Sequence, residues 1–194
     1  NHFIKMVNET TFLVRKLEML PFEFVIRRFA EGSYLKRNPG VERGKRFDEP
    51  VLEVFYKDDN IDDPFVSIKD DHTGILHQQK LPISKETFIR EISLDKTLIS
   101  KIQQESLNTF LLLEKLFSKQ GAILCDLKLE FGIDGKGSIL LGDSVEPDSW
   151  RLWQDNVNLD RNDGYEKDFD SDVITKIKEK YKLTKNFIQT LDFT

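Results

Sequence analysis

The feature that most constrains the fold is an unbroken alternation of apolar and charged residues from Cys125 to Phe131. Successive side chains of a β-strand point to opposite faces, so this period of two predicts a strand over residues 123–131. Its apolar face carries Cys125, Leu127, Leu129 and Phe131, and its polar face carries Asp126, Lys128 and Glu130. The apolar face is expected to lie in a core, where Cys125 acts as a small buried hydrophobic residue.

A second strand over residues 138–143 follows the glycine-rich segment 132–137, and together they predict a hairpin. A turn centred near Gly135 would set Asp143 opposite residues 126–128, close to Asp126 and Glu130. Three carboxylates this close repel one another unless a cation lies among them, and magnesium binds carboxylate and phosphate oxygens. An exposed hairpin face with an ordinary ladder of ion pairs is the alternative that the pattern leaves open.

Two earlier segments, 11–15 and 22–29, are rich in β-branched and aromatic residues and predict strands, with Pro21 marking the entry to the second. The segment 31–50 holds glycine, proline and many charges, which is typical of a loop. Loops of this length in compact domains are usually functional or disordered.

Two helices complete the prediction. Apolar residues at helical spacing run from Asp95, a candidate N-cap, to about Lys119, and Gly121 would end that helix. A last helix is expected from Ser171-Asp172, with Val173, Ile177, Tyr181 and Ile188 on one side. Strands and helices together favour the α+β class, and the length of the chain allows one large or two small domains.

Composition narrows the function. The chain has 32% charged residues, a net charge of −5 and no apolar run long enough to cross a bilayer, so neither a membrane nor bulk nucleic acid is an expected partner. The single cysteine cannot form an internal disulfide, and no signal peptide is evident, which together favour a cytoplasmic protein. The three histidines have neither metal-ligand nor triad spacing. A homo-oligomer is left open.

Charged residues are clustered along the chain. Residues 27–46 hold seven basic and two acidic residues, and acidic stretches follow at 58–71 and 155–172. Such runs are usually solvated faces, but a basic segment between acidic ones also suits a site that holds phosphate and metal together. The segment 146–153 adds two tryptophans around Arg151, where a guanidinium held on an aromatic wall could bind phosphate. A packed turn is the simpler interpretation.

Several segments, in order, resemble the SAICAR synthetase family. They are Glu18-Met-Leu-Pro-Phe-Glu23, Val25–Arg37, Phe55-Tyr-Lys-Asp-Asp59 with Asp63-Pro64, Asp126-Leu-Lys-Leu-Glu-Phe-Gly132, Gly142-Asp143 and Pro147-Asp-Ser-Trp-Arg-Leu-Trp153. The resemblance implies an α+β fold in one domain over residues 1–194, with a central antiparallel sheet and packed helices. It also implies an ATP-dependent carbon–nitrogen ligase of purine biosynthesis, phosphoribosylaminoimidazole-succinocarboxamide synthase. ATP would phosphorylate the carboxylate of carboxyaminoimidazole ribotide, and L-aspartate would displace the phosphate, giving SAICAR, ADP and phosphate.

The resemblance also implies roles for particular residues. The catalytic residues would be Lys128 and Asp148. The cofactors ATP and Mg²⁺ would be bound by Lys16, Leu17, Glu18, Met19, Asp126, Lys128, Glu130 and Asp143, with Glu130 and Asp143 as the metal ligands. The substrates would be bound by Arg27, Ser33, Arg37, Lys57, Asp58, Asp148 and Arg151, of which Arg27, Ser33 and Arg151 would hold the ribotide phosphate.

Two departures from the family pattern affect this expectation. The amino-terminal phosphate-loop subdomain of the family has no counterpart before Asn1, and Asp160 is followed by Arg161 where the family usually has an Asp-Lys pair. The alternative function is therefore a nucleotide- or partner-binding fragment of the same fold without turnover. A kinase-like phosphotransferase is disfavoured, because no Asp-Phe-Gly or His-Arg-Asp element is present.

Overall fold

A computed structural model describes residues 1–154, 157–158, 178, 181–182 and 184–189 of the chain. The main sheet is antiparallel and consists of β3 (Glu18–Phe29), β4 (Arg46–Tyr56), β5 (Phe65–Ile68), β6 (Thr73–His77), β7 (Phe88–Ser93), β8 (Ala122–Ile133), β9 (Ile139–Gly142), β10 (Trp150–Gln154) and β11 (Val157–Asn158). Its strands follow the order β11-β10-β8-β3-β4-β5-β6-β7, and β9 pairs with β8 beyond the end of β10. The predicted α+β class is confirmed.

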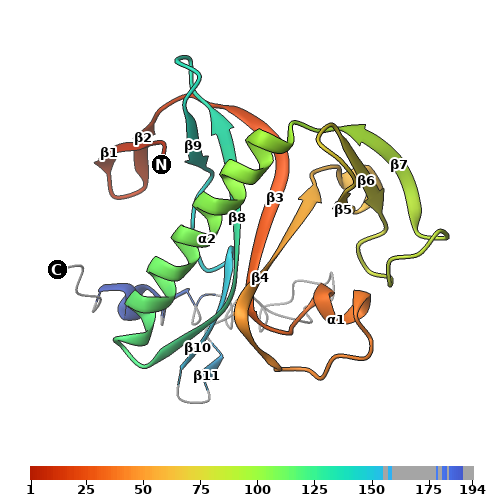
Figure 1. Cartoon of the computed structure of the whole chain (residues 1–194). Helices are drawn as coiled ribbons and strands as arrows, with labels where there is room; N and C mark the ends of the chain where they lie inside the picture. The colour runs from red at the N-terminus through yellow and green to blue at the C-terminus, as the bar shows by residue number, and fades with distance from the viewer. Residues whose placement is uncertain (155–156, 159–177, 179–180, 183, 190–194) are drawn as a thin grey trace.

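Helix α2 (Lys96–Ser118) packs across one face of this sheet (Figure 1). Its backbone begins as predicted, because the Asp95 carboxylate accepts a hydrogen bond from Leu98 N at 3.0 Å, and Gly121 with φ 73° follows its end. The core between helix and sheet contains Phe24, Ile26, Leu127 and Leu129 from the strands and Ile99, Ile102, Phe110 and Phe117 from the helix. Both β3 and β8 therefore direct one face toward α2.

The chain before β4 and the outer strands differ from the predictions. Pro21 lies inside β3 rather than at its entry, where the pairing with β8 shifts register between Met19 and Glu23. The segment 31–50 is not all loop, because it contains α1 (Ser33–Arg37) and the start of β4. Strands β5 to β7 were not predicted from their short sequences, and a 3₁₀ turn, η1 (Asp59–Ile61), precedes them.

The hairpin of β8 and β9 has a different register from the predicted one. Glu130 pairs with Gly142, so Asp143 follows beside Glu130 and not opposite residues 126–128. The turn is centred on Lys136 rather than Gly135, because the Asp134 carboxylate accepts hydrogen bonds from Lys136 N and Ser138 N, both at 2.9 Å. The convergence of three carboxylates expected from the sequence is therefore wrong.

Two further segments lie outside the main sheet. Strands β1 (Phe3–Asn8) and β2 (Thr11–Val14) form a separate hairpin beside β9 (Figure 1). Residues 184–189 are helical and pack Phe187 against Phe117 of α2, which fits the predicted last helix, although its expected start at residues 171–172 lies outside the described residues. The Asp160-Arg161 pair also lies outside them. No helix in the described part of the chain is long and apolar enough to span a membrane.

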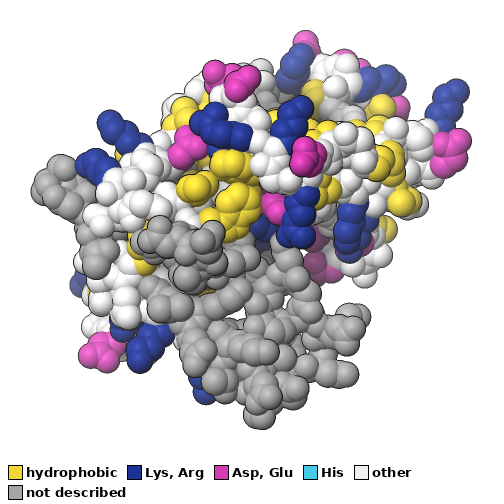
Figure 2. Space-filling view, turned by 90° about the horizontal axis from the view of Figure 1, so that it is seen from below, with side chains coloured by type: hydrophobic (Ala, Val, Ile, Leu, Met, Phe, Trp, Pro, Cys, Tyr) yellow, Lys and Arg dark blue, Asp and Glu magenta, His cyan; other side chains and the backbone are white. Residues whose placement is uncertain are grey.

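The basic run over residues 27–46 is partly buried, whereas the acidic residues of the run 155–172 lie outside the described residues. On the face shown in Figure 2, lysine and arginine side chains are interspersed with acidic and apolar ones. Three arginines of the basic segment are buried, with exposed fractions of 3% for Arg27, 6% for Arg28 and 5% for Arg37. A solvated basic face is therefore the wrong interpretation for these three, and each needs an acidic partner inside the fold.

Candidate functional site

A pocket of about 200 Å³ opens on the sheet face opposite α2. The register places Arg27 of β3 beside Asp126 of β8, and Asp126 beside Arg151 of β10. The predicted site residues that line the pocket are Arg27, Ser33, Asp126, Lys128, Asp148 and Arg151. The sheet thus brings together the three residues expected to hold the ribotide phosphate, from three separate parts of the sequence.

One oxygen of Asp126 holds the two pocket arginines together. Its Oδ2 accepts a hydrogen bond from Arg27 Nη1 at 2.6 Å and another from Arg151 Nη1. Burial raises the pKa of Asp126, and the two guanidinium groups oppose that rise by favouring the carboxylate. In this structure the Asp126 carboxylate pairs with two arginines, and its expected contact with the nucleotide stays a prediction.

The entrance to α1 completes this part of the pocket. Arg27 Nη2 donates to Ser33 Oγ at 3.3 Å, which links the predicted phosphate ligands directly. Gly32 has φ 57°, and a Cβ on it would lie 2.5 Å from Arg151 Nη2. Only glycine therefore allows both this backbone conformation and the approach of Arg151.

A second charged cluster lies farther along the same face, where Val25 pairs with Lys128 and Glu23 pairs with Glu130. Lys128 Nζ lies 3.3 Å from both Glu23 Oε1 and Glu130 Oε1, and Lys57 Nζ donates to Glu130 Oε2 at 2.6 Å. This lysine–glutamate cluster alternates charge around the pocket. Lys128 thus sits between the two arginines paired with Asp126 and the expected metal ligand Glu130.

Burial and ion pairing set the charge of this cluster. Burial disfavours the charged form of Lys128 and lowers its pKa, but the negative charges of Glu23 and Glu130 have the larger effect, so the pKa of Lys128 is raised. The pKa of Lys57 is raised in the same way, because Glu130 outweighs burial there. Burial raises the pKa of Glu23 despite the nearby Lys128 ammonium. The raised pKa of both lysines favours their ammonium form at neutral pH.

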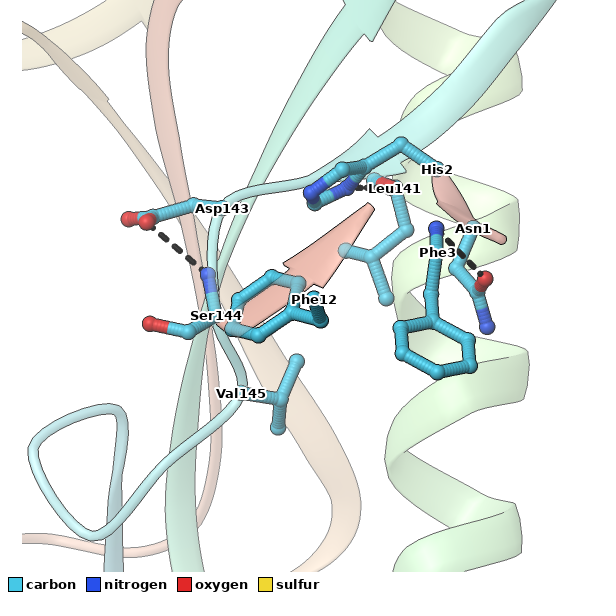
Figure 3. Close-up of a pocket in the computed structure, with 8 residues that line it drawn as sticks. All are labelled: Asn1, His2, Phe3, Phe12, Leu141, Asp143, Ser144 and Val145. Carbon is cyan, nitrogen blue, oxygen red and sulfur yellow. Dashed lines mark hydrogen bonds between the residues drawn. The ribbon is translucent and has the colours of Figure 1, made fainter. Parts of the chain in front are cut away.

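Asp143 lies at the end of β9, beside a second pocket of about 330 Å³. Its φ of 56° turns the chain, and its carboxylate accepts a hydrogen bond from Ser144 N at 2.8 Å. Figure 3 shows this carboxylate turned away from the apolar side chains that line the pocket, such as Phe3 and Phe12. Among the described residues, no three His, Cys, Asp or Glu side chains are grouped so that they could hold a metal ion.

The segment 16–19 crosses the polar face near Glu130. Cβ atoms on Gly132 and Gly142 would lie 2.8 Å from Leu17 Cβ and Met19 Sδ, respectively. Gly132 follows Glu130 by two residues and so faces the same side of β8. The predicted adenine-facing segment therefore lies beside the predicted metal ligands.

The remaining predicted residues lie around these clusters. Asp148 lines the main pocket, whereas Arg37 lines a neighbouring pocket of about 430 Å³. Arg37 Nη2 donates to Glu53 Oε1 at 2.6 Å rather than reaching the main pocket. The Asp58 carboxylate accepts from Asn60 N at 3.2 Å and caps η1. Neither Arg37 nor Asp58 lines the main pocket, but Arg37 contacts Gln79 and Phe55, which do.

Sequence reasoning missed two glutamates that organise the site. Glu53 accepts from Arg27 Nε at 2.6 Å, and Glu23 pairs with Lys128. Both stand alone between apolar residues in strands, at Leu52-Glu53-Val54 and Phe22-Glu23-Phe24. A single acid inside an apolar strand was the available signal, because such a residue is rarely buried without a cationic partner.

The sequence model described as SAICAR synthetase matches residues 1–187. The chain belongs to the SAICAR synthetase family. The chain is 39% identical over 194 residues to the probable multifunctional protein ADE2 of Caenorhabditis elegans, covering all of this chain and 43% of that protein. It is 38% identical over 152 residues to the phosphoribosylaminoimidazole-succinocarboxamide synthase of Roseiflexus castenholzii, covering 78% of this chain and 54% of the synthase.

Solved SAICAR synthetases share the fold. One, in complex with ADP, matches with a TM-score of 0.68 at 30% identity, over 96% of this chain and 70% of that one. The SAICAR synthetase of Pyrococcus horikoshii matches with a TM-score of 0.69 at 31% identity, over 97% of this chain and 72% of that one. The chain spans about half the length of the two curated relatives, at 43% and 54%.

Proposed function

We propose that this chain carries the substrate site of an ATP-dependent ligase that joins L-aspartate to carboxyaminoimidazole ribotide. The observation that carries the proposal is the pairing of Arg27 and Arg151 on one Asp126 oxygen beside Ser33. Two guanidinium groups and a hydroxyl form a donor set suited to a phosphate monoester, such as that of a ribotide. Relatives named as the synthase, and a family structure with ADP, support the same activity.

The proposed reaction has two steps. An oxygen of the ribotide carboxylate attacks the γ-phosphorus of ATP, the bond from phosphorus to the ADP oxygen breaks, and an acyl phosphate forms with release of ADP. The aspartate amine then attacks the acyl carbon, the carbon–oxygen bond to phosphate breaks, and the nitrogen loses a proton. Charge on the transferred group must be neutralised in both steps.

Lys128 has the position and charge for that neutralisation. It lies between the arginine cluster, Arg27 and Arg151, and Glu130, and its raised pKa keeps it protonated. We therefore assign it an electrostatic role on the transferred phosphoryl group rather than that of a general base. Asp148 also lines the pocket and is the remaining candidate for contact with the imidazole or for accepting the amine proton.

Mg²⁺ is a further part of the proposal. Magnesium commonly uses one or two protein carboxylates and takes its other ligands from phosphates and water. Glu130 and Asp143 fit this requirement, because Asp143 directly follows the residue paired with Glu130. When bound, the ion would neutralise nucleotide phosphate charge, and residues 16–19 would face the adenine. The substrates are then small molecules, in a cytoplasmic enzyme whose oligomeric state the sequence leaves open.

The test is ADP release by the protein with different sets of substrates. The ligase proposal predicts steady-state ADP release over many turnovers that requires ATP, the ribotide and L-aspartate together, with SAICAR as the product. If nucleotide binds but no set of substrates gives turnover, the ligase proposal is wrong for this protein and the alternative of a binding fragment holds.

A further inference from the structure

Glu53 contacts Arg27, one of the two arginines that Asp126 pairs with in the pocket. It lies in the middle of β4, is 6% exposed and is not among the residues that line the 200 Å³ pocket. Its two oxygens hold different arginines, with Oε2 2.6 Å from Arg27 Nε and Oε1 2.6 Å from Arg37 Nη2. Glu53 lines the neighbouring 430 Å³ pocket, and it is linked to the 200 Å³ pocket through Arg27.

The contacts of Arg27 fix how its guanidinium meets the pocket. Its Nε donates to Glu53 and its Nη1 donates to Asp126, on two different sides of the planar group. The Nη2 atom remains directed toward Ser33 Oγ, at 3.3 Å. Because a guanidinium binds phosphate through a rigid planar fork, the two carboxylates determine which donors a ligand meets.

Arg37 in turn anchors Glu53. Its guanidinium carbon lies 4.9 Å from the centroid of the Phe55 ring and 5.3 Å from that of Phe65. It also donates to the carbonyl oxygen of Gln79, and it is 5% exposed. Such packing leaves little freedom of rotation, so Arg37 holds Glu53 at a fixed distance from Arg27.

We propose that Glu53 is a positioning residue that orients Arg27 toward the phosphate of the ribotide substrate. This inference rests on the proposed function, because it assigns the phosphate to the pocket of Arg27, Ser33 and Arg151. It also gives Arg37 a different role from the one expected, since Arg37 supports Glu53 rather than binding substrate.

The test compares two ligands that differ only in the phosphate. Binding of carboxyaminoimidazole ribotide and of its dephosphorylated ribonucleoside is measured by calorimetry for the unmodified protein, Glu53→Gln and Glu53→Asp. We expect Glu53→Gln to bind the ribotide roughly tenfold more weakly, the scale of one charge-assisted hydrogen bond, with nucleoside affinity changed less than about twofold. Glu53→Asp keeps the charge and should recover part of the ribotide affinity.

Glu114→Gln is the matched control. Glu114 pairs with Arg28, the next residue after Arg27, through two hydrogen bonds of 2.6 and 2.8 Å on the α2 side of the sheet. We expect this variant to lose stability and keep its affinity for the ribotide. Equal weakening of ribotide and nucleoside in Glu53→Gln, or equal ribotide loss in the control, would overturn the positioning role.

The remaining outcomes separate the two proposals. If the unmodified protein does not prefer the ribotide to the nucleoside, the proposed phosphate site itself fails. If it does prefer the ribotide and Glu53→Gln keeps that preference, only the positioning role fails. If Glu53→Gln does not fold, the test relies on Glu53→Asp. An unchanged ratio of ribotide to nucleoside affinity in Glu53→Asp would then contradict the inference.

Discussion

Arg27, Arg28 and Arg37 are charges inside the fold, and each is held by a carboxylate: Arg27 and Arg37 by Glu53, Arg28 by Glu114. Removing one member of a buried pair leaves the other charge uncompensated, which typically costs about 3–5 kcal/mol. The charged residues of the site are therefore also structural. Tests of function must use changes that keep most of these contacts.

Gly32 offers one such change. In Gly32→Ala the new Cβ would meet Arg151 Nη2, and the positive φ of 57° would cost about 1–2 kcal/mol of stability. We expect the KM for the ribotide to rise about tenfold, as for the loss of one charge-assisted contact, while the KM for ATP stays nearly constant. Steady-state kinetics with each substrate varied would show this. An equal rise in both constants would argue against a specific effect on Arg151.

The metal assignment is tested at Glu130 and Asp143. Glu130→Gln and Asp143→Asn each keep the size of the side chain and remove an anionic ligand, so each should abolish magnesium-dependent ADP formation. Circular dichroism should show that the fold is retained. Unchanged turnover in both variants would remove Glu130 and Asp143 from the metal site.

At this scale the sequence predicted part of the site. Arg27, Ser33 and Arg151 were expected to converge, and the structure links them through hydrogen bonds. The partners of Asp126 were not predictable, because they depend on the register between strands that lie far apart in the sequence. Arg27 shows the difficulty most clearly, since its partners Glu53 and Asp126 lie 26 and 99 positions away.

At the scale of elements, the periodicity of the sequence predicted the main strand and helix correctly, whereas the predicted hairpin turn gave the wrong register. The period-two segment lies within β8, and the helical spacing matches α2 to within a residue at each end. The hairpin register moved because Asp134, rather than a glycine, organises the turn. Strands β5 and β6 have only four and five residues, too few for a clear period.

The turn makes a prediction about pH. Hydrogen bonds from Ser138 and Lys136 amides hold the pKa of Asp134 below its usual value. Because the folded pKa is depressed, the carboxylate stabilises the fold above the unfolded pKa of about 3.9, and that contribution is lost as the pH falls through the folded pKa. Asp134→Ala should therefore be less stable at neutral pH, with the difference shrinking in acid. Urea unfolding at several pH values would test this, and a difference independent of pH would contradict it.

The cap of α2 makes a second prediction at this scale. Asp95→Ala removes the acceptor for Leu98 N and should cost about 1 kcal/mol in the free energy of unfolding. Since α2 packs on the face opposite the pocket, the KM values for all substrates should remain unchanged. Thermal unfolding and steady-state kinetics of the same preparation would show whether stability and activity separate in this way.

For the whole molecule, the two faces of the sheet separate the apolar core from the candidate site. One face packs apolar side chains against α2, and the other carries the arginine and lysine–glutamate clusters along β3 and β8. Alternation along a strand therefore encodes the core and the site in alternate residues of the same segment. This explains why one segment of the sequence, 123–131, indicated both the fold and the chemistry.

The most direct test of this account is the KM for the ribotide, compared with the KM for ATP, in Arg151→Lys. Lysine keeps the positive charge but loses the planar fork, so a phosphate site predicts a ribotide KM about tenfold higher or more, with little change in the KM for ATP. If the KM for ATP rises while the ribotide KM stays constant, the pocket of Arg27, Ser33 and Arg151 binds the nucleotide, and the proposed site is wrong.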